Sequence, residues 1–205
     1  MKTHYQRRLP HIVPPGATLF FTFRLAGSIP AAVWQQLAEA RGLAMQQATA
    51  QATSATQQAA LLTRLHKQHF AICDALLDQA GQGPTWLREA GIAEVVRQEI
   101  DALAELEVVV VAYCIMANHV HLILQLPTTA GFSAARMMQR LKGRTALAAN
   151  KLLGRSGQAF WQHESYDHVV RSGTEQARVI AYVLNNPVKA GLVEDWTQWP
   201  YTYVM

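Results

Sequence analysis

Hydrophobic positions concentrate in residues 108–126, VVVVAYCIMANHVHLILQL, where two apolar runs flank His119 and His121. Each run is long enough and β-branched enough to form a buried strand, and Ala117-Asn118 provides a tight turn between them. Alternate residues of a strand point to the same face, so His119 and His121 present two imidazoles side by side. The pattern predicts a β-hairpin that carries two nitrogen ligands for a divalent metal.

Shorter patterns on either side of this hairpin predict further strands. Residues 17–25, ATLFFTFRL, alternate between large apolar and polar side chains, as a half-buried strand does. Phe160-Trp161 and residues 166–170 favour a short strand or a pair of strands.

Two helices are predicted after the hairpin. Apolar residues at helical spacing place one over 133–153, with Ser133 as its N-cap. A second helix covers about 174–185 and ends before Pro187, because proline disfavours helical geometry in the residue that precedes it.

Residues 28–106 separate the first strand from the hairpin by more than a simple crossover requires, and we interpret them as a helical insertion lobe within one domain of residues 1–205. The segment is rich in Ala, Gln and Leu, which are strong helix formers. We expect helices near 30–41, 44–79 with a break around Ser54, and 93–104.

The last helix carries a candidate nucleophile and a third metal ligand. Arg178, Tyr182 and Asn186 are spaced four residues apart, so they share one helical face. The Asn186 carboxamide oxygen suits Mg²⁺ or Mn²⁺, and Tyr182 would lie one turn before it. A phenol has a pKa of about 10, so a nearby cation would help it to ionise. The alternatives are core packing for Tyr182 and helix capping for Asn186.

Length and composition describe a folded globular protein. The chain has 205 residues, of which half are hydrophobic and 16% are charged. No apolar run approaches the roughly 20 residues of a membrane span, and the first residues lack the hydrophobic region of a signal peptide. Cys73 and Cys114 lie far apart in apolar surroundings and are expected as free thiols. We therefore expect a cytoplasmic, nucleoid-associated protein without a membrane partner.

Charge is distributed unevenly along the chain. Its net charge is +4, yet residues 1–38 and 108–163 contain no Asp or Glu. Such a division favours a polyanion bound on one face, although an ordinary solvated surface is the alternative. The candidate DNA-binding residues are Arg7, Arg8, Arg24, Arg136, Arg140, Lys142 and Arg144, and three of them (Arg136, Arg140 and Arg144) form a ridge at helical spacing.

Three segments carry a resemblance to a known family. MANHVHLIL, LLGRSGQAFWQHESYDHVV and AYVLNNPVKAGLV resemble the REP-associated tyrosine transposases, which are single-tyrosine members of the HUH nuclease superfamily. RRLPHIVPPGATLFFTFRL and GPTWL are also similar to that group, so the likeness covers nearly the whole chain. Ala117 stands where proline is usual, but no departure removes a proposed ligand or nucleophile.

The resemblance implies a fold and an activity. The fold would be α+β, a ferredoxin-like antiparallel sheet with helices on one face. The substrate would be single-stranded or hairpin DNA of repetitive extragenic palindromes, bound by a monomer or a homodimer. Tyr182 would attack the scissile phosphate to give a 5′-phosphotyrosine, with Mg²⁺ or Mn²⁺ held by His119, His121 and Asn186.

Two other function classes remain open from the sequence. One is a non-catalytic single-strand DNA-binding protein that retains the fold, with Phe160 or Trp161 contacting bases. The other is a metallohydrolase that uses His119, His121 and a water on a small substrate. Tyr166 is the main rival nucleophile, but Val170 four residues later cannot bind metal, which favours a structural role for Tyr166.

Overall fold

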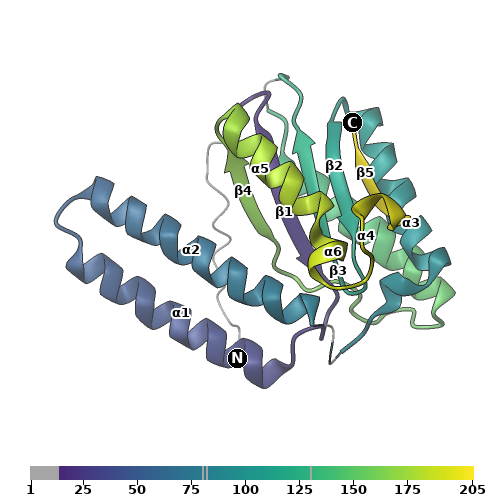
Figure 1. Ribbon diagram of the computed structural model, residues 1–205, viewed down its shortest axis with the longest axis horizontal. Helices are drawn as coiled ribbons and strands as arrows, with labels where there is room; N and C mark the ends of the chain where they lie inside the picture. Colours follow the sequence, from purple (N-terminus) through teal and green to yellow (C-terminus); the bar gives the residue numbers. More distant parts are fainter. Residues whose placement is uncertain (1–13, 80, 82, 130) are drawn as a thin grey trace.

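The apolar strands of the sequence form an antiparallel sheet of five strands in the computed structural model (Figure 1). The structure describes residues 14–205 with the exception of 80, 82 and 130. The strands are β1 (Thr18–Arg24), β2 (Val109–Ile115), β3 (His119–Gln125), β4 (Tyr166–Val170) and β5 (Thr202–Val204). Their order is β4-β1-β3-β2-β5. The first four follow the ferredoxin-like order, and β5 extends the sheet beyond β2.

Strand β3 is the centre of this sheet. It pairs with β2 through a hairpin in which Cys114 lies opposite His121, and with β1, where Thr22 lies opposite His121. The predicted turn between the two apolar runs is confirmed, since residues 116–118 connect β2 to β3. The side chains of His119 and His121 are fully buried, because helices cover the face of the sheet on which they lie.

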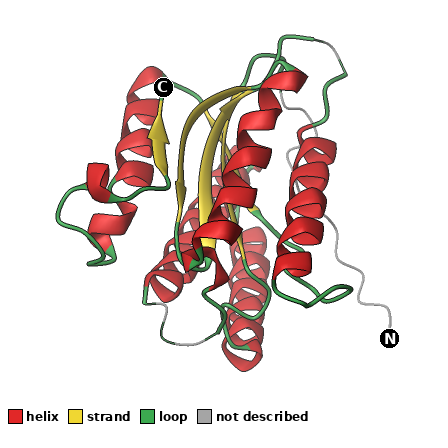
Figure 2. Ribbon diagram, turned by 90° about the vertical axis from the view of Figure 1, so that its right-hand side faces the viewer, coloured by secondary structure: helices red, strands yellow, loops and turns green. Residues whose placement is uncertain are grey.

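Helices cover both faces of the sheet, which corrects the expectation of helices on one face (Figure 2). On one side α3 (Ala90–Asp101) and α4 (Ala134–Leu152) pack against Val120, Leu122 and Leu124 of β3. On the other side α5 (Gly173–Leu184) packs over Ile123, on the face that carries both histidines. The physical reason is that β3 is apolar on both faces, so each face must be covered by another layer. The α+β class itself is confirmed.

The boundaries of the two helices after the hairpin follow the sequence signals closely. Ser133 caps α4 by accepting a hydrogen bond from the Arg136 backbone N–H, as predicted. Among the described residues, no helix is long and apolar enough to cross a bilayer. The α-helices are α1 (Ala31–Gln51), α2 (Ala55–Asp78), α3 (Ala90–Asp101), α4 (Ala134–Leu152), α5 (Gly173–Leu184) and α6 (Asn186–Lys189). The 3₁₀ helices are η1 (Trp86–Arg88), η2 (Ala102–Leu106) and η3 (Trp196–Gln198).

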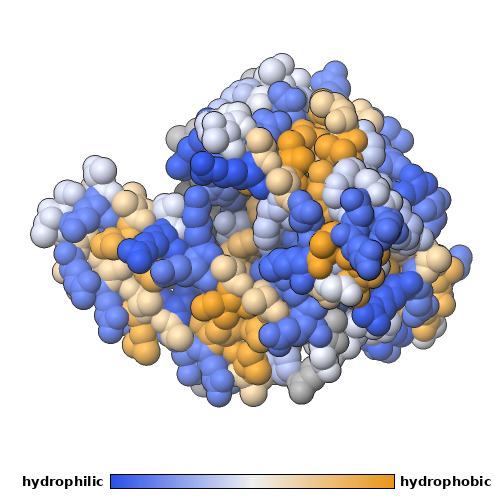
Figure 3. Space-filling model, viewed as in Figure 1, coloured by the Kyte–Doolittle hydropathy of each residue, from blue (hydrophilic) through white to orange (hydrophobic). Residues whose placement is uncertain are grey.

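The segment assigned to the insertion lobe divides into two parts. Helices α1 and α2 form a hairpin that projects from the body of the protein, whereas α3 packs into the core (Figures 1 and 3). The break between α1 and α2 lies at the predicted place, since Ser54 caps α2 through the Gln57 backbone N–H. Gly42 does not interrupt α1, because a glycine inside a helix costs only about 1 kcal/mol. The projecting lobe is therefore α1 and α2 alone.

Burial on both faces of β3 gives a prediction about stability. Leu122 is fully buried, so Leu122→Ala should lower the free energy of unfolding by about 2–5 kcal/mol through lost contacts and a residual cavity. Leu147→Ala is the matched control, because the Leu147 side chain on α4 is 77% exposed and its loss should change stability by less than about 0.5 kcal/mol. Urea unfolding followed by circular dichroism measures both, and equal midpoints for the two variants would contradict the assignment of the core.

Candidate active site

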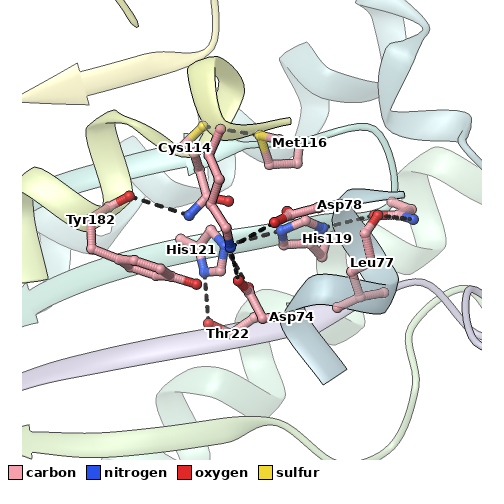
Figure 4. A network of polar contacts seen from close by, with 12 residues as sticks. Thr22, Asp74, Leu77, Asp78, Cys114, Met116, His119, His121 and Tyr182 are labelled. Atoms are coloured by element: carbon pink, nitrogen blue, oxygen red, sulfur yellow. Dashed lines mark hydrogen bonds and ion pairs between the residues drawn. The ribbon is translucent and has the colours of Figure 1, made fainter. Parts of the chain in front are cut away.

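His119 and His121 meet at the centre of the sheet. Their Nε2 atoms lie 3.0 Å apart, and both side chains are fully buried (Figure 4). Burial, reinforced by the neighbouring His121, lowers the pKa of His119 well below its usual value. His119 is therefore a neutral imidazole, which is the form that binds metals.

Hydrogen bonds fix how His119 presents its nitrogens. The Asn118 carboxamide donates from Nδ2 to the Leu77 carbonyl oxygen at 3.1 Å, which leaves its Oδ1 as an acceptor for His119 Nδ1 at 2.7 Å. Since His119 is neutral and its proton lies on Nδ1, its Nε2 carries a lone pair. On His121 it is likewise Nδ1 that is held, by Thr22 Oγ1 at 2.7 Å. The Nε2 atoms of His119 and His121 therefore point toward each other.

Asp74 of α2 joins the two histidines, which sequence reasoning missed. Its side chain is only 2% exposed, and Oδ1 lies 3.3 Å from His121 Nε2. One ligand atom from each of Asp74, His119 and His121 lies within 4.8 Å of the others. Burial opposes ionisation of Asp74, but His121, Tyr182 and Lys189 together hold the pKa of this carboxyl well below its usual value. The available signal was a pair of acids, Asp74 and Asp78, inside an otherwise apolar helical stripe.

Tyr182 lies against the histidine pair, as its spacing predicted. Helix α5 places its ring centroid 5.4 Å from that of His121. Its hydroxyl is buried close to the Asp74 carboxylate and the Asn186 carboxamide, without a hydrogen bond of normal geometry to either. Burial, followed by the charge of Asp74, raises the pKa of Tyr182 far above that of a free phenol. Without a compensating positive charge the phenol stays protonated.

Asn186 begins α6 rather than ending α5. The C-cap of α5 is Asn185, so the capping alternative raised for Asn186 does not describe its position. Its side chain is fully buried, with Nδ2 donating to the Tyr182 carbonyl oxygen at 3.2 Å. Oδ1 has no hydrogen-bond partner among the described residues. A buried, unpaired carboxamide oxygen beside a histidine pair is available for a ligand.

The donor set suits a divalent cation. Three buried oxygens, on Asp74, Tyr182 and Asn186, have no hydrogen-bond partner among the described residues, and the two Nε2 atoms lie beside one of them. Mg²⁺ and Mn²⁺ prefer oxygen ligands, and Mn²⁺ also accepts imidazole. These residues therefore fit the metal that the sequence resemblance implies.

Most candidate DNA contacts lie away from this cluster. Arg140 and Arg144 of α4 belong to the opposite helical layer, where they pair with Glu105 at 3.8 Å and Glu99 at 2.8 Å. Arg136, which donates its backbone N–H to Ser133, lies on the same helix. Arg7 and Arg8 lie outside the described residues. The role of the ridge in DNA binding stays a prediction.

Arg24 and Lys142 have structural partners. Arg24 lies on the histidine face of β1, but its side chain is buried, with the guanidinium 4.4 Å from the Trp34 ring centroid and bonded to Ser28. The Lys142 ammonium donates to the carbonyl oxygens of Gln162 and His163, so it holds the loop before β4.

Comparisons with known proteins find similarity over this part of the chain. The family model described as "Transposase IS200 like" matches residues 86–186, a range that includes both histidines, Tyr182 and Asn186 but neither α1 nor α2. A Haemophilus influenzae protein classed as a REP-associated tyrosine transposase is 31% identical over 99 residues. That match covers 45% of this chain and 56% of the relative, so the chain spans about half the length of the protein it matches.

A solved structure shares the fold. It is a REP-associated tyrosine transposase bound to a REP hairpin, and the likeness covers 98% of this chain and 82% of that one, with a TM-score of 0.57 and 16% identity. At this identity the likeness shows the architecture alone. The family model and the Haemophilus influenzae relative confirm the predicted resemblance to the REP-associated tyrosine transposases, with residues 86–186 matching the IS200-like transposase model.

Proposed function

We propose that the protein is a metal-dependent single-strand DNA endonuclease and transposase that acts on REP-type hairpins, with Tyr182 as its nucleophile. The observation that carries this proposal is the meeting of two separate elements: β3 brings His119 and His121 together, and α5 sets Tyr182 against them. The IS200-like domain supports the reaction class, and the hairpin-bound structural neighbour supports the substrate.

The reaction is an in-line displacement at phosphorus. The Tyr182 oxygen forms a bond to the scissile phosphate while the bond from phosphorus to the 3′ oxygen breaks. The phenol loses its proton and the departing 3′ oxygen gains one, which leaves a 5′-phosphotyrosine and a free 3′-hydroxyl. The covalent link conserves the bond energy, so rejoining needs no nucleotide triphosphate. His119, His121 and Asn186 would hold a divalent cation, which supplies charge stabilisation at the phosphate and lowers the pKa of the phenol.

A cleft gives a strand of DNA a route to this site. It has a volume of about 810 Å³ and lies between the α1–α2 hairpin and the loop that precedes β4. Thr22 and Asp74 line its inner end, and Trp34, Phe70 and Tyr166 add aromatic rings. Such rings can stack on unpaired bases without sequence preference.

A non-catalytic DNA-binding protein is the second candidate. The burial of the Tyr182 hydroxyl favours it, because a nucleophile must reach its phosphate. Incubation of the protein with a labelled REP-type hairpin and Mn²⁺, followed by a denaturing gel, separates the two. A covalent protein–DNA band supports the transposase and excludes a hydrolase that uses only metal-bound water, whereas binding without any band supports the non-catalytic protein.

Tyr182→Phe should abolish the covalent band while DNA binding stays within about twofold of wild type, because only the attacking oxygen is removed. Tyr166→Phe is the matched control. Tyr166 stacks on Phe70 with ring centroids 4.0 Å apart, and Val170 four residues later offers no metal ligand, so Tyr166 has a packing role. Retention of the band in Tyr182→Phe together with its loss in Tyr166→Phe would reverse the assignment.

Asn186→Ala tests the third ligand. If Asn186 binds the metal, the variant should need about tenfold or more Mn²⁺ for half-maximal cleavage, and Asn186→Asp should partly restore the wild-type value. Asn185→Ala serves as the control, because Asn185 caps α5 and its side chain donates to the Ala181 carbonyl oxygen. Superimposable metal titrations for wild type and Asn186→Ala would remove Asn186 from the site.

The arginine ridge of α4 is tested by salt dependence. Replacing Arg136, Arg140 or Arg144 by Gln should weaken binding across DNA sequences and flatten the plot of log affinity against log salt by about one unit. Arg97→Gln on α3 is a control, because Arg97 pairs with Glu94 and Asp101 of its own helix. If the salt dependence of DNA affinity were unchanged in all three variants, the arginines of the ridge would be ordinary solvated side chains without a role in DNA binding.

A further inference from the structure

We propose that the projecting α1–α2 hairpin completes the metal centre: Asp74, in the last turns of α2, is a carboxylate ligand of the cation held by His119 and His121. The inference rests on the metal site of the proposed function and adds a ligand to it. The family model matches residues 86–186, so this ligand comes from a segment outside the matched domain.

The geometry of the cluster fits a cation. Asn118 Oδ1 accepts from His119 Nδ1, which turns the Nε2 atom of this ring toward His121. His121 Nε2 lies 3.0 Å from His119 Nε2 and 3.3 Å from Asp74 Oδ1. One ligand atom from each of the three residues lies within 4.8 Å of the others, and all three side chains are buried. Two imidazole nitrogens and a carboxylate oxygen at this spacing form a ligand set for a divalent cation.

The two carboxylate oxygens of Asp74 have different surroundings. Oδ2 accepts from the Lys189 ammonium at 2.9 Å, and the same ammonium lies 2.7 Å from Asp78. Oδ1 has no hydrogen bond of normal geometry, although its side chain is only 2% exposed. Lys189 thereby fixes one oxygen of the carboxylate, and the other lies 3.3 Å from His121 Nε2.

A second contact ties the same helix end to the site. The Leu77 carbonyl oxygen accepts from the Asn118 carboxamide, which in turn selects the metal-binding tautomer of His119. Leu77 and Asp74 are neighbours on one side of α2, so the last turns of this helix both orient one ligand and supply another. If the end of α2 were only anchored to the rest of the protein, the ion pairs of Lys189 with Asp74 and Asp78 would be sufficient.

The test is Mn²⁺ binding to the full-length, DNA-free protein, measured by isothermal titration calorimetry, with the metal-induced rise in melting temperature as a second readout. Asp74→Ala and Asp74→Asn should each weaken Mn²⁺ binding by about tenfold or more and shrink that rise. Asp78→Asn is the matched control. It removes the second carboxylate that pairs with Lys189, and Asp78 is not one of the proposed metal ligands. It should bind Mn²⁺ within about twofold of wild type.

The two proposals fail separately. Wild-type Mn²⁺ affinity in both Asp74 variants, with affinity lost in His119→Ala, would overturn the role of Asp74 and leave the histidine site standing. Equal losses in Asp74→Asn and Asp78→Asn would also overturn it, since they would trace the effect to Lys189. An unchanged affinity in His119→Ala would contradict the metal site of the proposed function itself. A lower melting temperature of the metal-free Asp74 variants does not affect the comparison, because the readout is the shift caused by Mn²⁺.

Discussion

The arrangement of this protein depends on the burial of two imidazoles at the centre of an apolar sheet. Buried polar groups must find partners, since an unpaired one costs about 1–3 kcal/mol. His119 and His121 draw those partners from four directions: Asn118 from the hairpin turn, Thr22 from β1, Asp74 from α2, and each other. The chain therefore brings distant segments to β3, and the chemistry of the site follows from that convergence.

The electrostatics of the cluster set the condition under which Tyr182 can react. Its burial and the charge of Asp74 raise the pKa of the phenol, so the negative carboxylate alone works against ionisation. Lys189 partly offsets this, with its ammonium 5.6 Å from the Tyr182 ring centroid and bound to Asp74. A cation among the histidines would reverse the local field, which links metal binding to activation of the nucleophile.

The α1–α2 hairpin has two ends with different characters. Its distal part projects from the body (Figure 3), and the Leu43 side chain in the middle of α1 is an exposed apolar one. The end of α2 is instead built into the buried cluster through Asp74, Leu77 and the Lys189 ion pairs. Helix α2, which contacts the histidines, therefore also forms one wall of the cleft. A strand of DNA bound in the cleft would lie along α2.

Local patterns in the sequence determined strands β1 to β4, the boundaries of α4 and α5, the histidine pair and Tyr182, because each depends on spacing within one element, whereas β5 was not predicted. Ser54 and Ser133 marked helix starts for the same reason. The tertiary structure alone decided that helices cover both faces, that α3 belongs to the core, and that Arg24 is buried against Trp34. It also decided the position of Asp74, whose contact with His121 joins two elements far apart in the chain. No periodicity encodes such a pairing, since it arises only when separate helices and strands pack together.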